Sequence, residues 1–554
     1  MTFLSVSTKI EKLASYLRTE EASAMPILKN KLFLYLTEFF AGMSVMAVEL
    51  GASRLLAPYF SSSQIVWTII IGTIMIAMAL GNIYGGRSAD KNPNPDKLYG
   101  RILVAAVWIA AIPVVGKYII MGISALLIFT VSTNFLIWAA LAACMVIFVF
   151  PLFLLGTVTP SLAKYSVDSL EDSGKVVGTL GAFNTIGSII GTFVPTFLSI
   201  PSVGTSVTFL IFAGILLVLS LIYFISGRRG AVKCAVAAAL YVICCVFGRS
   251  GSFAFWESGL TYEGESIYNY LQVKEDSRRV ILSTNVLFGV QSLMMKEDGL
   301  TGMYYDYAMA APLMAGQERP EECSVLILGM GTGTYARQCR SYFGGDMEIE
   351  GVEIDGKITD LARTYFDLPG DVEVTTYDGR AYLNAVDKKY DVIMVDAYQD
   401  ITIPFQMSSM EFFMLVQAHL APDGVMVVNM NMRGSGEENI NAYLSDTIAA
   451  VFEQVYTVDV TGSTNRELFA GNGPLLENLQ ARLEAVERAD LIALLGDVAA
   501  RLTPYQPGQR IMTDDKAPVE LLGMRVIDEL IRDEVAYYKN IYEREGIRGV
   551  INGL

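Results

Sequence analysis

Seven stretches in the amino-terminal half of the chain are apolar over the length of a membrane-crossing helix. They lie near residues 32–57, 65–84, 102–121, 135–156, 178–199, 205–225 and 231–248. About 20 apolar residues in a helix span the hydrocarbon of a bilayer, so we expect a transmembrane bundle over residues 32–249. A segment at 119–131 is a candidate for one more crossing. Residues 1–31 mix charged and apolar positions at helical spacing, which predicts an amphipathic helix on the inner membrane surface.

The pattern changes after residue 252, where the hydropathy falls. Residues 264–273 alternate polar and apolar positions, and further short strands follow, which predicts a small β module. Apolar strands then alternate with helical segments, which is typical of a doubly wound (Rossmann-like) α/β domain. The predicted domains are 1–31 (amphipathic segment), 32–249 (membrane bundle), 250–304 (β module), 305–470 (Rossmann-like domain) and 471–554 (helical extension).

Four predicted strands of the α/β domain end in glycine or a carboxylate. They span 325–328, 348–354, 372–376 and 391–395, and the residues at their ends are Gly329, Gly331, Gly333, Glu353, Asp378, Gly379 and Asp396. Glycines let the backbone approach a ligand, and a carboxylate about 20 residues further on suits a ribose hydroxyl. Because parallel strands end at one edge of a sheet, these residues predict a nucleotide site.

Composition and charge narrow the class of protein. Hydrophobic residues make up 53% of the 554 residues, which is too high for a soluble enzyme of this size and predicts a lipid membrane as a partner. Residues 1–249 hold 17 basic and 10 acidic residues, a charge of +7, and the rest hold 24 and 47, a charge of −23. An acidic domain is a poor nucleic-acid binder and a better host for cations, so we expect no nucleic-acid partner.

Cysteine and histidine usage argues against a metal centre. The six cysteines form no Cys-x-x-Cys pair, and His419 is the only histidine of the chain. Histidine-based metal clusters and Ser-His-Asp triads are therefore excluded, and we expect no metal.

Polar residues within the apolar stretches are candidate contacts for an ion or a substrate. Glu38 and Glu49 lie in the first stretch and Asn184 in the fifth, and polar groups at membrane depth are costly unless they are paired. The alternative is that Glu49 and Arg54 form a structural ion pair near the interface. Gly181, Gly187, Ser188 and Gly191 predict close helix packing.

Residues 265–429 resemble the polyamine aminopropyltransferases, or spermidine synthases. The matching motifs are Glu265-Ser266-x-Tyr268-Asn269, Gln291, Tyr304-Tyr305-Asp306, the glycine loop, Val352-Glu353-Ile354-Asp355, Tyr377-Asp378-Gly379-Arg380 and Tyr390-Asp391-Val392-Ile393-x-Val395-Asp396. The first half resembles the membrane part of bacterial proteins in which a major-facilitator-like bundle is fused to such a domain. Its motifs are Glu49-Leu50, residues 55–60, Gly85-Gly86-Arg87-x-Ala89-Asp90 and residues 151–160, and the closing Thr513-Asp514-Asp515-x-Ala517-Pro518-Val519-Glu520 is similar to that group too.

The resemblance implies transfer of an aminopropyl group from decarboxylated S-adenosylmethionine, the co-substrate, to a diamine such as putrescine. Asp396 would take the proton of the attacking amine, unless it only caps a strand-to-helix turn. The implied cofactor-binding residues are Gln291, Gly329, Gly331, Gly333, Glu353, Asp378 and Gly379. The implied amine-binding residues are Tyr268, Tyr304, Asp306 and Asp400. Soluble relatives assemble as dimers or tetramers, so a homodimer is one expectation.

Three departures from the family pattern keep other activities open. Thr332 stands where the family's glycine loop carries an aspartate, Gln399 precedes Asp400 where an acid is usual, and Tyr305 replaces a histidine. An aspartate in the loop would repel the carboxylate of intact S-adenosylmethionine, and threonine removes that repulsion. The alternatives are an S-adenosylmethionine-dependent methyltransferase or other alkyl transferase, and a polyamine transporter or sensor with a regulatory nucleotide-binding domain.

Two arguments about the side of the membrane on which the catalytic domain lies point in opposite directions. Basic residues in the amino-terminal tail, in 85–101, in 157–177 and at Arg228-Arg229-x-x-x-Lys233 place alternate loops inside. Seven crossings would then leave the carboxy-terminal domain outside. An adenosyl cofactor is made in the cytoplasm, so we expect a multi-pass protein of the cell membrane with a cytoplasmic catalytic domain. Either 119–131 would then cross or 178–199 would re-enter.

Overall fold

A computed structural model of the chain shows two compact units, residues 1–131 with 135–255 and residues 132–134 with 256–554. It describes residues 27, 30–128, 130–131, 133–166, 173–249, 252–257, 259–286, 289–397, 403–431 and 439–553. Each unit has hydrophobic clusters of its own. Met43, Ala47 and Phe212 form one in the first unit, and the second unit holds two more.

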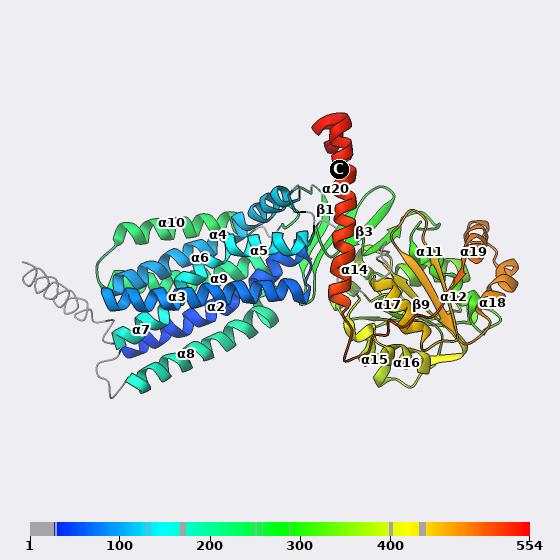
Figure 1. Ribbon diagram of the computed structural model, residues 1–554, viewed down its shortest axis with the longest axis horizontal. Helices are drawn as coiled ribbons and strands as arrows, with labels where there is room; N and C mark the ends of the chain where they lie inside the picture. The colour runs from blue at the N-terminus through cyan, green and yellow to red at the C-terminus, as the bar shows by residue number, and fades with distance from the viewer. Residues whose placement is uncertain are drawn as a thin grey trace, which may run out of the picture. The chain divides into compact units, whose positions relative to one another are not determined.

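The first unit is a bundle of helices that run alongside one another (Figure 1). They are α2 (Lys31–Phe60), α3 (Gln64–Lys91), α4 (Pro95–Leu127), α5 (Phe135–Ile147), α6 (Val149–Gly156), α7 (Val158–Ser166), α8 (Ser173–Val194), the π-helix η1 (Pro195–Ser199), α9 (Ile200–Ser226) and α10 (Ala231–Gly248). By length and composition, the described residues contain five helical segments that could cross a membrane. The count rises to six if α5 joins the α6–α7 segment as one span bent by 50°.

The difference from the seven expected crossings lies in the segment from α8 to α9. It is counted as one helix of 54 residues, which at 1.5 Å per residue would be about 80 Å long, more than twice the hydrocarbon thickness. Gly204 breaks it, with φ 81° and ψ 167°, between the two expected stretches 178–199 and 205–225. The extra segment expected at 119–131 forms no helix of its own, because α4 continues through most of it to Leu127.

Close packing of α2 on α8 places polar groups inside the bundle. A Cβ on Gly187 would lie 2.0 Å from the Phe39 carbonyl oxygen, and one on Gly191 would lie 2.1 Å from that of Met43. Close approach at these two glycines is therefore confirmed. Moving four residues along α8 corresponds to moving four residues in the same direction along α2, so the two helices are parallel. Glu38, which is fully buried, accepts a hydrogen bond of 2.7 Å from the Asn184 amide.

The second unit begins with a four-stranded antiparallel sheet, as the alternating pattern predicts. Its strands, in spatial order, are β1 (Leu260–Glu265), β2 (Tyr270–Glu275), β3 (Arg279–Ser283) and β4 (Ser292–Met295). The turn between β1 and β2 carries Ser266, Tyr268 and Asn269.

The main sheet has eight strands in the order β12-β10-β11-β9-β8-β5-β6-β7. The strands are β5 (Ser324–Leu328), β6 (Glu348–Glu353), β7 (Glu373–Thr376), β8 (Tyr390–Val395), β9 (Leu420–Met430), β10 (Gln454–Asp459), β11 (Arg466–Gly471) and β12 (Thr503–Pro504). Strands β5 to β9 are parallel, and β10 to β12 add an antiparallel edge. The strand order reverses at β5, and ligands bind at the carboxyl ends of strands beside such a reversal.

The helices of this unit lie beside the sheet, except the last one, which extends away from it (Figure 1). They are α11 (Tyr304–Ala308), α12 (Ala310–Met314), η2 (Pro320–Glu322), α13 (Thr334–Phe343), α14 (Gly356–Tyr365), α15 (Gly379–Ala385), η3 (Phe405–Met407), α16 (Met410–His419), α17 (Ile440–Ala449), α18 (Leu475–Arg482), η4 (Leu483–Ala485), α19 (Ala489–Arg501) and α20 (Val519–Gly553). Val325 and Ile327 of β5 contribute to a hydrophobic cluster with α11, α12 and α13. The expected Rossmann-like fold, preceded by a small β module, is therefore present.

Candidate active site

The glycine loop after β5 needs glycine for two reasons. Gly329, Gly331 and Gly333 have φ values of 80°, 58° and 82°, in the left-handed region that other residues rarely adopt. A Cβ on Gly329 would lie 2.5 Å from Cα of Ala397, and one on Gly331 would lie 2.7 Å from Oγ of Ser292. The loop therefore passes close to the end of β8 and to the small sheet, which brings these elements around one hollow.

That hollow is a cavity of about 290 Å³ at the carboxyl ends of the central strands. Eight of the predicted site residues line it: Tyr268, Gln291, Gly329, Gly331, Glu353, Asp378, Gly379 and Asp396. The remaining wall comes partly from the segment before α16, with Pro404, Gln406 and Met407. The three carboxylates expected at neighbouring strand ends thus border one cavity, while their individual roles stay predictions.

Glu353, at the end of β6, lines the cavity, and backbone amides hold its carboxylate. Its Oε2 accepts a 2.9 Å hydrogen bond from the Gly331 amide, and Oε1 accepts one of 3.0 Å from the Asp355 amide. Burial raises the pKa of Glu353 to about 7, although the backbone hydrogen bonds oppose the shift. Each oxygen keeps a second lone pair, so the carboxylate can accept hydrogen bonds from ligand hydroxyls.

Asp396, directly after β8, is held by side chains from two other elements. The Tyr304 hydroxyl of α11 donates to Oδ2 at 2.6 Å, and the Asn429 amide of β9 donates to Oδ1 at 2.9 Å. The Asn465 amide donates in turn to Oδ1 of Asn429 at 2.8 Å. Burial raises the pKa of Asp396 to about 7, with a further contribution from the charge of Glu353. A carboxyl group with such a pKa can take up and release a proton near neutral pH.

Asp378, which also lines the cavity, is the N-cap of α15. Its Oδ1 accepts a 2.8 Å hydrogen bond from the Ala381 amide and so caps the helix. Gly379 follows at the first helical position. A carboxylate at a helix amino terminus is stabilised by the helix dipole, which leaves Asp378 rigidly placed beside the cavity.

The small sheet is attached to the end of β6 through Asp355. The Ser266 hydroxyl donates to Oδ2 of Asp355 at 2.5 Å, and the Asn269 amide donates to the same oxygen at 3.0 Å. Oδ1 of Asp355 accepts from the Lys357 amide at the start of α14. These bonds fix the turn that carries Tyr268, whose partly exposed ring forms part of the cavity wall.

Four predicted site residues do not line the cavity. Gly333 precedes the first residue of α13 as its N-cap. Tyr304 is buried, and its hydroxyl donates a hydrogen bond to Asp396. Asp400 lies outside the described residues.

Asp306 is the fourth, and its contacts are structural. It is 1% exposed, and its carboxylate accepts hydrogen bonds from the amide and hydroxyl of Thr301, the amide of Gly302 and the side chain of Gln338. These bonds join the start of α11 to α13. Asp306 does not line the cavity, and its predicted contact with the amine stays a prediction.

Three residues near Asp396 have no role in the sequence analysis. They are Asn429, Asn465 and Glu467. Glu467 lies opposite Asn429 in the β11–β9 pair and is fully buried. Neither of its carboxyl oxygens has a hydrogen-bond partner in the described part of the chain, and burial raises its pKa well above the usual value. Glu467 is a charged residue two positions before Phe469 in an otherwise apolar segment of strand length, and this was the signal available in the sequence.

Two further observations concern the expected chemistry. Thr332, at the position of the family's aspartate, is 1% exposed and is not part of the cavity wall. Within the described ranges, no group of three or more His, Cys, Asp or Glu side chains could hold a metal ion.

Comparisons with known proteins agree with this geometry. A model of the spermine/spermidine synthase domain matches residues 304–462. The chain is 54% identical over 352 residues, 60% of its length and 78% of the relative's, to a probable polyamine aminopropyl transferase of Bifidobacterium longum. It is 25% identical over 289 residues, 49% of its length and 93% of the relative's, to a polyamine aminopropyltransferase of Vibrio vulnificus.

Among solved structures, a probable spermidine synthase from Corynebacterium glutamicum superposes with a TM-score of 0.34 at 18% identity, covering 46% of this chain and 97% of that one. The family follows from the sequence relatives. With a Rossmann-like domain that holds three carboxylates around one cavity, and with this level of identity, the chain belongs to the polyamine aminopropyltransferase (spermidine synthase) family of transferases.

Proposed function

We propose that this protein transfers an aminopropyl group from decarboxylated S-adenosylmethionine to a diamine such as putrescine and releases methylthioadenosine. The observation that carries the proposal is Asp396, a buried carboxyl group whose pKa is raised to about 7. It borders the same cavity as Glu353 and Asp378. The site thus combines a proton acceptor with two groups suited to an adenosyl ligand.

The donor would lie across the ends of β5, β6 and β7. Glu353 accepts hydrogen bonds from the ribose hydroxyls, and Asp378 accepts one from the adenine amino group. Gln291 contacts the nucleoside from the small sheet, and the glycine loop lets the backbone come close. The sulfonium is a cation, so the carboxylates of this cavity favour its binding.

The reaction is a displacement at the methylene group bonded to the sulfonium. The acceptor arrives as an ammonium and loses one proton to Asp396, which frees the nitrogen lone pair. That lone pair forms the new C–N bond, the C–S bond breaks, and its electron pair stays on sulfur to give the neutral thioether. Catalysis then consists of alignment and proton transfer. Tyr268 would line the path of the amine and Tyr304 would hold Asp396 in place, and contact of Asp400 with the amine stays a prediction.

Replacing Asp396 by Asn tests the proposal. The amide has the same shape but cannot accept the amine's proton, so turnover should fall by at least about 100-fold. Calorimetry should show methylthioadenosine binding within about twofold of the wild type, because the residues assigned to the nucleoside are unchanged. Unchanged product formation would remove the role of Asp396.

The choice of donor is tested by product analysis. Mass spectrometry of reactions with decarboxylated and with intact S-adenosylmethionine, each with a panel of diamines, distinguishes aminopropyl from methyl transfer. We expect aminopropyl products with the decarboxylated donor alone. Methylated products would favour the methyltransferase alternative, which rests on Thr332 standing in place of the family's aspartate.

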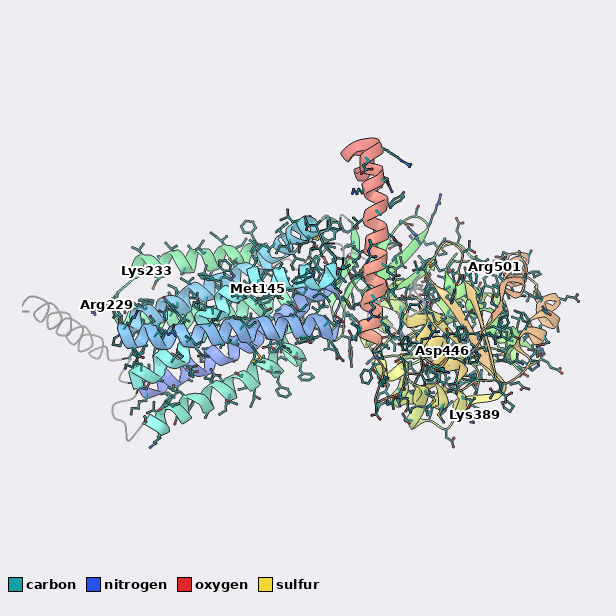
Figure 2. All side chains as sticks on the ribbon, in the orientation of Figure 1. Met145, Arg229, Lys233, Lys389, Asp446 and Arg501 are labelled. Atoms are coloured by element: carbon teal, nitrogen blue, oxygen red, sulfur yellow. The ribbon has the colours of Figure 1, made fainter. Side chains whose placement is uncertain are left out.

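We propose further that the bundle anchors the enzyme in the cell membrane and that the catalytic domain is cytoplasmic, where the donor is made. Arg229 and Lys233, labelled in Figure 2, lie at one end of the bundle, and Arg229 approaches Asp96 at 3.8 Å. With α8 and α9 counted as two crossings, the positive-inside rule predicts the opposite side. A reporter fused to the carboxy terminus decides between the two, and light scattering in detergent tests the predicted homodimer.

A further inference from the structure

The closing Thr513–Glu520 motif makes contacts that the proposed reaction does not explain. Asp514 forms a two-pronged ion pair with Arg380 of α15, with both N–O distances at 2.7 Å. Oδ1 of Asp514 also accepts a 2.5 Å hydrogen bond from the Ser409 hydroxyl, the N-cap of α16. The Asp514 amide donates to Glu411 in the first turn of α16 at 3.0 Å. One carboxylate therefore ties together the starts of two helices.

The segment that presents Asp514, residues 512–516, is itself anchored, and we refer to it as the strap. Met512 is fully buried. Its carbonyl oxygen accepts from the Met410 amide at 2.9 Å, and its amide donates to the Thr447 hydroxyl at 3.0 Å. Thr513 and Lys516 exchange two backbone hydrogen bonds, which closes a tight turn with Asp514 and Asp515 at its tip. The strap thus holds Asp514 in a defined position.

The two helix starts that Asp514 joins also form one wall of the cavity. Asp378 and Gly379 open α15, and Gln406 and Met407 come just before α16. Arg380 continues the connection, because its Nη1 donates to the Gln406 carbonyl oxygen at 2.9 Å. A Cβ on Gly379 would lie 3.3 Å from the Met407 side chain, so the two parts of this wall already touch. The Arg380–Asp514 pair adds a second connection between them.

We propose that Asp514 is a positioning residue that sets the width of the adenosyl cavity. The strap would hold Asp378 and the segment before α16 at the spacing that the nucleoside requires. The affinity for the donor would therefore depend on a carboxy-terminal segment outside the Rossmann-like domain. This inference rests on the proposed function, which assigns the cavity to the donor.

The physical basis is the combination of charge and geometry. A carboxylate near two helix amino termini is stabilised by both helix dipoles. A two-pronged arginine–carboxylate pair restricts orientation as well as distance, so it is a stiffer connection than a single hydrogen bond. Asparagine at 514 would keep the size of the side chain but lose the charge and the second acceptor. The wall would then be free to open, and the donor would bind to it less well.

The test compares Asp514→Asn with the wild-type full-length protein in detergent. We expect KM for decarboxylated S-adenosylmethionine to rise roughly tenfold, the effect of losing hydrogen bonds to a charged group. The diamine KM should stay within about twofold, as should kcat, and the pH dependence of kcat should not change, because Asp396 and its partners are untouched. Arg380→Lys, which keeps the charge without the two-pronged contact, should give a smaller increase. Its combination with Asp514→Asn should be less than additive.

Asp515→Asn is the matched control, because it removes the same charge from the neighbouring, exposed position and should change neither KM. An unchanged donor KM in Asp514→Asn would overturn the proposal, and so would an equal change in the control. A variant with a lower kcat, higher KM values for both substrates and a lower melting temperature would show that the strap is only structural. If the wild type transferred no aminopropyl group, the proposed function would fail. In that case, the affinities of Asp514→Asn and Asp515→Asn for methylthioadenosine would still test the role of the strap.

Discussion

The proposed chemistry depends on the protonation of buried carboxyl groups. Asp396 and Glu353 lie at the same cavity, and burial raises the pKa of each to about 7. A carboxyl group with its usual pKa would be ionised throughout the physiological range and would accept a proton only weakly. At these two positions, burial therefore makes acid–base chemistry near neutral pH accessible.

The activity should consequently rise with pH through about 7. Asp396 can accept the amine's proton only as a carboxylate. Its raised pKa means that this form is scarce at pH 6 and predominant at pH 8. We expect kcat/KM to increase about tenfold over each pH unit below the midpoint, as measured by methylthioadenosine release at saturating donor. A profile that is flat between pH 5.5 and 8 would contradict the assignment.

Glu467 illustrates the cost of a buried carboxyl group without a partner. It is fully buried, and its two oxygens lack hydrogen-bond donors among the described residues. Methionine has a similar volume and no need for a donor, so Glu467→Met should raise the free energy of unfolding by about 1–3 kcal/mol. Urea unfolding at pH 7.5 measures the change, with Glu484→Met in η4 as a control. A loss of stability would indicate a partner for Glu467 in the folded protein.

The glycine loop shows how an element shapes the site. Gly329 has a φ of 80°, and a Cβ there would meet backbone atoms of Ala397. Gly329→Ala should therefore destabilise the domain by at least about 2 kcal/mol and abolish donor binding, because strain and a backbone clash combine.

Thermal unfolding and calorimetry with methylthioadenosine test this prediction. Gly370→Ala is the matched control, because a Cβ there has nothing within 4 Å and its φ is not in the left-handed region. It should leave binding unchanged. Normal binding by Gly329→Ala would show that the loop does not approach the ligand.

At the scale of the whole molecule, the catalytic site belongs to one of the two units. All residues that line the cavity and both large hydrophobic clusters beside it lie within residues 256–554. A fragment 256–554 should therefore fold and keep kcat for aminopropyl transfer within about threefold of the full-length protein in detergent. Mass spectrometry of the products measures this. An inactive but folded fragment would show that the bundle takes part in the reaction.

Local pattern was enough for the order of the main elements. Apolar runs of strand length ending in glycine or aspartate predicted the positions of β5, β6, β7 and β8 within about one residue. This works because backbone sterics and the two-residue period of a strand act over a few neighbouring residues. The crossings were harder to count. Hydropathy alone does not reveal that α4 continues to Leu127 through most of the extra segment at 119–131, whereas the break at Gly204, within α9, falls between the two stretches expected from the sequence.

What the sequence determined by itself was a bundle of long apolar helices, an α/β domain and a set of carboxylates at strand ends, because hydropathy, periodicity and turn chemistry are local properties. Only the tertiary structure decided which polar groups meet. Asp306 accepts hydrogen bonds from α13 and from the loop before α11. Asn429, itself bonded to Asn465, donates a hydrogen bond to Asp396. Asp514 pairs with Arg380, from which it is separated by 134 positions in the sequence. These contacts join residues far apart in sequence, and the pKa shifts at Glu353 and Asp396 arise from burial. Both depend on the packing of the whole domain and not on any segment of it.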